Sequence, residues 1–95
     1  MTYSQKVKKG KEVVKRMEEL SVNEKFTFRY KNEIYQMTCY SQYEDGRKSY
    51  SVSKPTSIES MNVWDMGRTS FELYTYNMMN KRSTYRMEMG EMELV

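Results

Sequence analysis

The chain has 95 residues, a net charge of +3, one cysteine and no histidine, and this length predicts a single domain, residues 1–95. Because histidine titrates near neutral pH and is the commonest metal ligand, its absence excludes Ser–His and Cys–His nucleophiles and histidine-based zinc sites. Aliphatic residues are few, with three Leu, two Ile, seven Val and no Ala, so Phe, Tyr, Val and Met are expected to build the core.

The first predicted element is a helix over residues 4–20. Apolar residues recur there at spacings of three and four, which places them on one stripe of a helix. The stripe consists of Tyr3, Val7, Gly10, Val13, Val14, Met17 and Leu20. Thr2 and Gln5 have the spacing of a capping box, so the helix is expected to begin between them.

After Asn23 the apolar period changes to two, which is typical of half-buried strands. The alternation predicts strands at about residues 25–30, 34–41, 48–53, 61–66, 69–77 and 83–89. Asp45-Gly46 is a hairpin signal between the second and third of these strands. Residues 57–61, just before the fourth strand, are alternatively predicted as a single helical turn. Met92 and Leu94 are the alternative location of one more short strand.

Three strands carry expectations about side-chain direction. In the fourth strand, Met61 and Val63 are expected on one face, with Trp64 and Met66 on the other. Cys39 shares the apolar face of the second strand and is expected to be an inert core residue. Met87 and Met89 in the sixth strand are likewise expected in the core.

Short connections between strands force antiparallel neighbours, and a sheet must cover its apolar face. The leading helix is the only long element that can do so. We therefore predict an α+β fold in which one N-terminal helix packs on a curled antiparallel meander of five or six strands.

The N-terminal stretch is the most basic part of the chain. Residues 1–54 carry twelve basic and seven acidic side chains, against four and six in residues 55–95. One interpretation is a phosphate-facing helix, and the other is a solvated helix face. The nucleic-acid-binding candidates under the first interpretation are Lys6, Lys8, Lys9, Lys11, Lys15 and Arg16.

Tyrosines occur throughout the predicted strands, and the alternation directs some of them outward. Outward aromatic side chains suit protein interfaces or stacking on unpaired bases, although tyrosine is also a common strand residue. Tyr74, Tyr76 and Arg86 form the best outward cluster, with Tyr40 if its strand lies nearby. Trp64 has two equal interpretations, a core residue or an interface anchor. Met78 and Met79 are candidates for a partner or homodimer contact. These seven residues are the predicted partner-binding set.

No motif for catalysis, phosphate binding or a metal or cofactor is present, so we expect a protein that is not an enzyme and that needs no cofactor. With no long apolar run, no apolar segment of a secretory signal and one cysteine, a cytoplasmic location without a membrane contact is predicted. The main hypothesis is a module that binds a protein partner, including one within a nucleoprotein complex. The alternatives are direct nucleic-acid binding and a homodimeric structural protein.

In size and composition the chain resembles small products of phages and mobile elements, including anti-CRISPR inhibitors of host defence. A composition rich in Lys, Tyr, Asn and Met suits an A/T-rich genome of that kind. No residue motif carries this resemblance. The net positive charge of the chain also argues against a protein that mimics DNA through acidic residues.

Overall fold

The structure is a computed structural model that describes residues 2–56, 60–67, 69–76 and 82–95, with the backbone alone for residues 64–65, 74–76 and 82–84. One helix is followed by strands and a short 3-10 turn. In chain order the elements are α1 (Tyr3–Glu18), β1 (Lys25–Tyr30), β2 (Glu33–Gln42), β3 (Lys48–Ser53), β4 (Ser60–Met66), β5 (Ser70–Tyr76), β6 (Arg82–Glu88), η1 (Met89–Glu91) and β7 (Glu93–Leu94).

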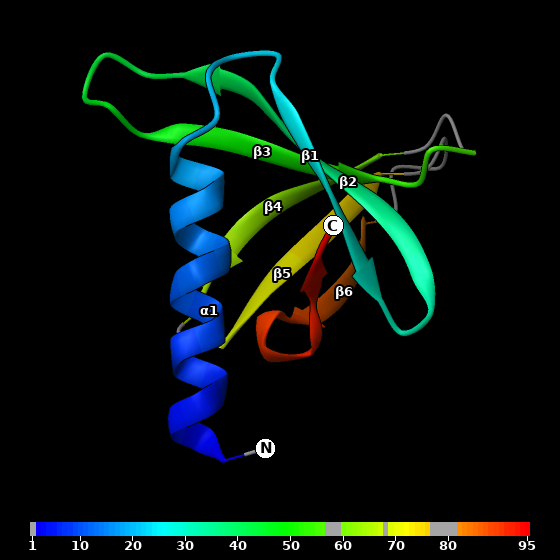
Figure 1. Ribbon diagram of the computed structural model, residues 1–95. Coiled ribbons are helices and arrows are strands. Elements are labelled where there is room, and N and C mark those ends of the chain that lie inside the picture. The colour runs from blue at the N-terminus through cyan, green and yellow to red at the C-terminus, as the bar shows by residue number, and fades with distance from the viewer. Residues whose placement is uncertain (1, 57–59, 68, 77–81) are drawn as a thin grey trace.

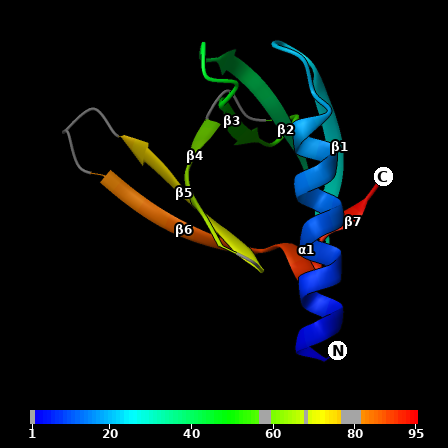
Figure 2. The same ribbon diagram turned by 90° about the vertical axis from the view of Figure 1, so that its left-hand side faces the viewer.

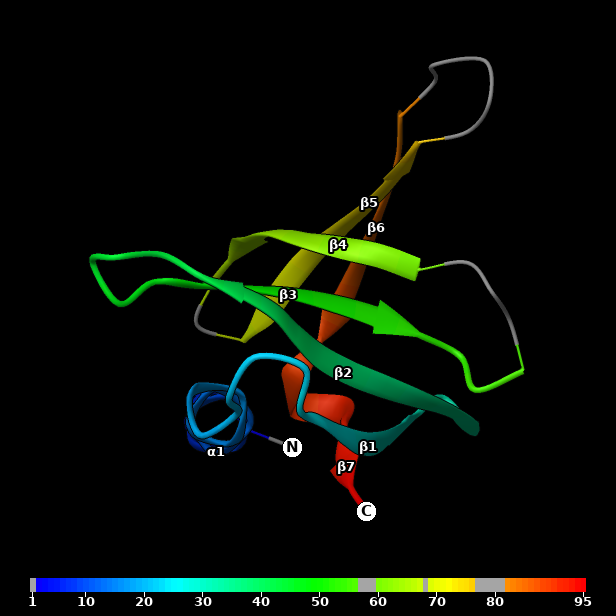
Figure 3. The ribbon, with the colours of Figure 1, turned by 90° about the horizontal axis from the view of Figure 1, so that it is seen from above.

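The predicted α+β class, with one helix packed on a curled antiparallel sheet, is confirmed (Figure 1, Figure 2 and Figure 3). The sheet has seven strands rather than five or six, in the order β6-β5-β4-β3-β2-β1-β7. The additional strand, β7, pairs with β1 through Phe28–Leu94 and Arg29–Glu93 only. Met92 with Leu94 was the alternative given for one more short strand, and the structure places β7 there, at Glu93–Leu94. The count of five or six strands left this alternative out.

Helix α1 is capped at both ends by side chains. The predicted capping box is present, since the Gln5 amide donates to Thr2 Oγ1 at 3.2 Å and the Thr2 amide donates to Gln5 Oε1 at 2.9 Å. At the other end, Lys48 Nζ donates to the carbonyl oxygens of Glu18 and Leu20, both at 2.7 Å. The lysine satisfies carbonyls that a helix end leaves without partners.

The helix rests on η1, and this contact depends on a glycine. A Cβ added at Gly90 would lie 3.0–3.3 Å from Cγ, Cβ and Cα of Lys6, closer than most side chains tolerate. The buried stripe of α1 consists of Gly10, Val13 and Met17. Tyr3, expected on this stripe, is 64% exposed because the first turn of α1 extends beyond the sheet (Figure 1).

The concave face of the sheet holds the core. It is built from aromatic and sulphur-containing side chains with few aliphatic ones, as the composition predicted. Cys39, Met87 and Met89 are all fully buried, as expected. The largest fully buried side chains on the sheet and η1 are Tyr30, Phe28, Phe71, Met37, Leu73, Met87 and Met89.

A β-bulge changes the direction of side chains at the end of β4. The register shifts between Val63 and Asp65, and Met66 is then paired with Phe71. Residues directly opposite in an antiparallel pair share a face, so Met66 lies on the concave face with Phe71 and Val63. The expectation that Met66 and Val63 lie on opposite faces was therefore wrong, because strict alternation takes no account of an inserted residue.

Candidate binding site

A groove lies between α1 and the end of β4. Val7, Gly10 and Val14 of the helix form one apolar wall, and Met66 with Gly67 forms the other. The hollow has a volume of about 570 Å³. It exists because α1 turns Val13 and Met17 into the core, which leaves the neighbouring edge of its apolar stripe, with Val7 and Val14, partly exposed.

The groove continues into a wedge between β3 and β4. The ladder between these strands covers Ser51–Asn62 to Ser53–Ser60, and beyond it the strands diverge toward α1 (Figure 1). The resulting hollow has a volume of about 590 Å³ and is lined on the hairpin side by Gln42, Gly46, Arg47, Lys48 and Tyr50. Both hollows share Val14, Glu18 and Met66, so they are adjacent, and together we call them the helix–hairpin groove.

The rim of the helix–hairpin groove is mainly cationic. Lys11 and Lys15 are exposed along the helix wall, and Glu18 is the one carboxylate among the described lining residues. At the hairpin end, Arg47 is paired with Asp45, and Lys48 donates to carbonyls at the end of α1. Within the described part of the chain, the four ion pairs closer than 4 Å all lie outside α1. The helix lysines therefore present their charge to solvent.

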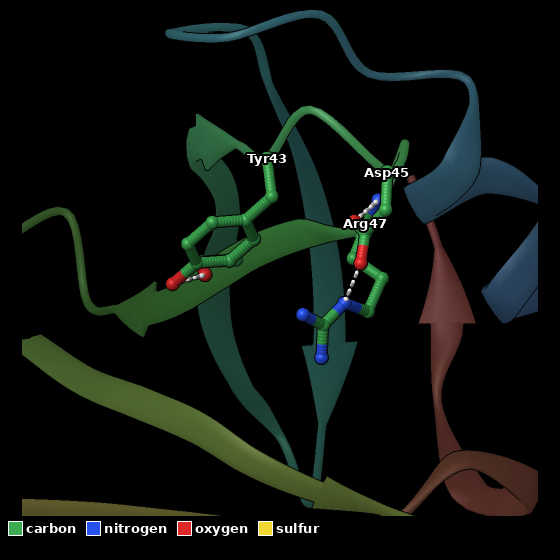
Figure 4. Close-up of polar contacts among 4 residues, drawn as sticks. Tyr43, Asp45 and Arg47 are labelled. Carbon is green, nitrogen blue, oxygen red and sulfur yellow. Dashed lines mark hydrogen bonds and ion pairs between the residues drawn. The ribbon is translucent and has the colours of Figure 1, made fainter.

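The tip of the β2–β3 hairpin borders the groove and is held in one conformation by its own side chains (Figure 4). Asp45 Oδ1 accepts from the Arg47 amide at 3.0 Å, and Asp45 Oδ2 accepts from Arg47 Nε at 2.6 Å. The Arg47 guanidinium lies 5.5 Å from the ring centre of Tyr43, whose hydroxyl accepts from Ser49 Oγ at 3.3 Å. Tyr43 is nevertheless 55% exposed, so it is an aromatic side chain available at low entropic cost.

The electrostatics of the tip follow from these contacts. The Arg47 amide, reinforced by its guanidinium, holds the pKa of Asp45 below its ordinary value. Gly46 has a φ of +91°, a conformation that the tight turn requires and that glycine adopts without strain. The hairpin thus presents a fixed Asp–Arg pair beside an exposed ring.

The predicted partner-binding residues do not form one described cluster. Tyr40 is 45% exposed on β2, and Arg86 is exposed on β6, where its Nε donates to Ser70 Oγ at 3.1 Å and lies 3.2 Å from Glu88 Oε1. Three strands separate β2 from β6, so Tyr40 does not join Arg86.

The remaining members of that set fall outside what the structure describes. Trp64 lies on β4 and Tyr74 and Tyr76 lie on β5, where only the backbone is described. Met78 and Met79 lie outside the described residues. The prediction for these five side chains therefore stays a prediction.

The six basic residues of α1 are divided between different surroundings. Lys8, Lys11 and Lys15 are exposed, whereas Lys6, Lys9 and Arg16 are partly buried. Lys6 packs beside Gly90. The Arg16 guanidinium lies 5.2 Å from the ring centre of Phe26, where it covers the core. Of the six, only Lys11 and Lys15 reach the helix–hairpin groove.

The sequence reasoning missed the residues that make the groove. Val14 was placed in the core stripe and Met66 on the wrong face, and the hairpin was treated as a turn signal only. An available signal was the apolar stripe of α1, which is wider than a helix can bury against one small sheet.

In comparisons with known protein families, curated proteins and solved structures, nothing matched this chain. Among the described residues, no group of three or more Cys, Asp or Glu side chains is arranged to hold a metal ion. No helix in the described part of the chain is long and apolar enough to cross a membrane.

Proposed function

We propose that this chain is a small binding protein without catalytic activity, which acts by occupying a surface of a larger macromolecular machine through its helix–hairpin groove. The observation that carries the proposal is an open apolar groove with a cationic rim, bordered at one end by the β2–β3 hairpin. Partly exposed apolar residues gathered in one depression and rimmed by polar groups are typical of an interaction site.

The composition of the groove agrees with a protein partner. Protein interfaces are enriched in Tyr, Met and Arg, and the residues that line the groove include Tyr50, Met66 and Arg47. Met66 is 37% exposed, and its flexible side chain adapts readily to the shape of a partner. These features favour recognition of a surface over chemistry on a small substrate.

The biological setting that we propose is the cytoplasm of a host cell, with the chain acting as an accessory protein or inhibitor from a phage or mobile element, for example an anti-CRISPR-type inhibitor. The small size, the single N-terminal helix on a sheet and the composition expected from an A/T-rich genome support this setting. A partner within a nucleoprotein complex also suits the net charge of +3.

The test is affinity capture from a host lysate with and without nuclease. We expect one protein partner to survive nuclease treatment. A double variant of two groove residues, Lys15→Glu with Met66→Gln, is expected to lose this partner, whereas Tyr85→Ala, which removes an exposed tyrosine of β6 that does not line the groove, retains it. If nuclease removes every captured protein, the proposal fails.

The alternative is a nucleic-acid-binding module that uses the basic face of α1. Its support is the exposure of Lys8, Lys11 and Lys15 without a carboxylate within 4 Å among the described residues. Phosphate contacts would make the affinity for DNA or RNA fall steeply with salt concentration. Undetectable binding to single- and double-stranded oligonucleotides at low salt would eliminate this alternative. Sedimentation would decide whether a homodimer forms.

A further inference from the structure

We infer that the occupant of the helix–hairpin groove is an acidic amphipathic helix of a protein partner. The inference rests on the proposed function and specifies the chemistry of the partner. Three properties of the groove lead to it: its length along α1, the chemistry of its walls and the sign of its rim.

The first property is length. The helix wall of the groove runs from Val7 to Glu18. At a rise of 1.5 Å per residue, these residues span about 16 Å, or about three helical turns. A helix laid alongside α1 would therefore contact the groove over about three turns, with anchors spaced like those of other helix-in-groove complexes.

The second property is the chemistry of the walls. The amides and carbonyls of α1 are hydrogen-bonded within the helix and at its caps, so this wall offers side chains and no backbone partners. An extended peptide along it would leave backbone groups unpaired on that side, whereas a helix satisfies its own. Val7, Val14 and Met66 are apolar, and Gly10 with Gly67 leaves room for a close approach. These walls match an apolar helix face.

The third property is charge. Lys11 and Lys15 stand one helical turn apart beside the apolar wall. At the hairpin end, Arg47 is paired with Asp45, so the positive charge of the rim comes mainly from the two helix lysines. Glu18 is the only carboxylate that lines the described groove. An occupant with Glu or Asp beside its apolar stripe would meet opposite charges along the rim, which sets its orientation and speeds association. A basic helix would meet like charges there.

The probe is a fluorescein-labelled peptide of about 18 residues, because shorter isolated helices are marginal in water. It carries Leu at spacings of three and four with Glu beside this stripe. Two control peptides replace every Glu with Lys, or keep the composition and scramble the Leu positions. We expect the acidic amphipathic peptide to bind the full chain more tightly than either control and to gain helical circular dichroism on binding.

The matched variants are two double charge reversals. Lys11→Glu with Lys15→Glu changes the rim, whereas Lys9→Glu with Lys25→Glu reverses two lysines that line neither hollow of the groove. The rim variant is expected to weaken binding of the acidic peptide by at least about tenfold, and the control variant by less than about threefold. Met66→Gln keeps the side-chain length and is expected to weaken binding by about fivefold through lost apolar contact. Far-UV circular dichroism confirms that each variant is folded.

Several results would overturn the inference. One is that the acidic peptide shows no saturable binding up to about 1 mM, the range of a single weak contact. Another is that the scrambled peptide binds equally tightly. A third is that the basic peptide or a DNA duplex binds more tightly. Self-association of the chain that Met66→Gln abolishes would assign the groove to a second copy instead. If the peptide fails while a nuclease-resistant partner is still captured from lysate, the proposed function stands and only the acidic helix is excluded.

Discussion

Lys48 on β3 and Glu18 at the end of α1 are 30 residues apart in sequence, and the ammonium group of Lys48 lies 2.7 Å from the carbonyl oxygen of Glu18. The same ammonium donates to the Leu20 carbonyl at 2.7 Å. A cation at a helix C-terminus satisfies the last carbonyls and interacts favourably with the helix dipole. This one side chain therefore fixes the angle at which the helix meets the hairpin, and so shapes the wedge end of the groove.

Replacing Lys48 with Met keeps most of the side-chain volume and removes both hydrogen bonds. We expect the free energy of unfolding to fall by about 1–2 kcal/mol, the usual effect of losing charge-assisted hydrogen bonds at a partly buried helix end. Urea unfolding followed by circular dichroism measures the change. Lys25→Met, on an exposed strand position, is the control and is expected to change stability by less than about 0.5 kcal/mol.

The second contact that holds α1 is its approach to Gly90. Gly90→Ala places a Cβ 3.3 Å from the Cα of Lys6, where the flexible end of a side chain cannot simply move aside. We expect a loss of about 1–3 kcal/mol from overpacking. Gly67→Ala is the matched control, because its Cβ would meet the nearest atom, the Ser70 carbonyl oxygen, at an ordinary 3.5 Å. A Gly90→Ala protein as stable as the Gly67→Ala protein would contradict the close packing of helix on η1.

These two contacts explain why the strands were predictable and the groove was not. Phe26, Phe28 and Tyr30 alternate with polar residues because one face of β1 is buried, so the local sequence pattern is enough to predict the strand. The position of α1 depends on the burial of Val13 and Met17 and also on Lys48 and Gly90. The last two residues meet the helix from far along the chain and leave no periodic signal. The groove arises from that position.

Local irregularities account for the other differences. The inserted residue between Val63 and Met66 reverses the face of Met66 without changing the alternation before it. The helix ends at Glu18, two residues before the predicted end, and Leu20 follows in a tightened turn in which its amide donates to the Met17 carbonyl at 3.1 Å. Capping by a distant side chain decided this boundary, whereas the capping box at Thr2 is local and was predicted correctly.

Alkaline pH is expected to destabilise the fold through Tyr35. Burial, with a hydrogen bond from its hydroxyl to Glu33 Oε2 at 2.9 Å, raises the pKa of Tyr35 from 10.0 to about 12. The neutral phenol of Tyr35 is therefore favoured more strongly in the folded state than in the unfolded state. This contribution is fully present below pH 10 and is lost as the pH rises to about 12.

The measurement is the urea midpoint across this alkaline range, together with the absorbance of tyrosinate. Tyr35→Phe is expected to reduce the decline in stability between pH 10 and pH 12, while Tyr40→Phe, which removes an exposed phenol, serves as the control. Burial also raises the pKa of Tyr50, with the nearby Cys39 adding to it, so part of the decline is expected to persist. An unchanged decline in Tyr35→Phe would show that the loss of stability has another origin.

The hairpin tip allows the two sources of the low pKa of Asp45 to be separated. The hydrogen bond from the Arg47 amide is the larger cause, and the Arg47 guanidinium adds a smaller one. Arg47→Ala keeps the amide and removes the guanidinium, so the pKa of Asp45 is expected to rise only part of the way to its ordinary value. An NMR titration of the Asp45 carboxyl carbon measures it, with Arg29→Ala, which breaks an exposed ion pair with Glu93, as the control.

A full return of the Asp45 pKa in Arg47→Ala would mean that the turn itself loosens when the guanidinium is removed. Because the lowered pKa keeps Asp45 charged in the folded state, this carboxylate holds Arg47 in place until the pH falls through that pKa. Below it the arginine is released and Tyr43 loses its neighbour. The hairpin tip that borders the helix–hairpin groove is therefore expected to soften in acid before the sheet unfolds, and the amide signals of residues 43–47 would report this local change.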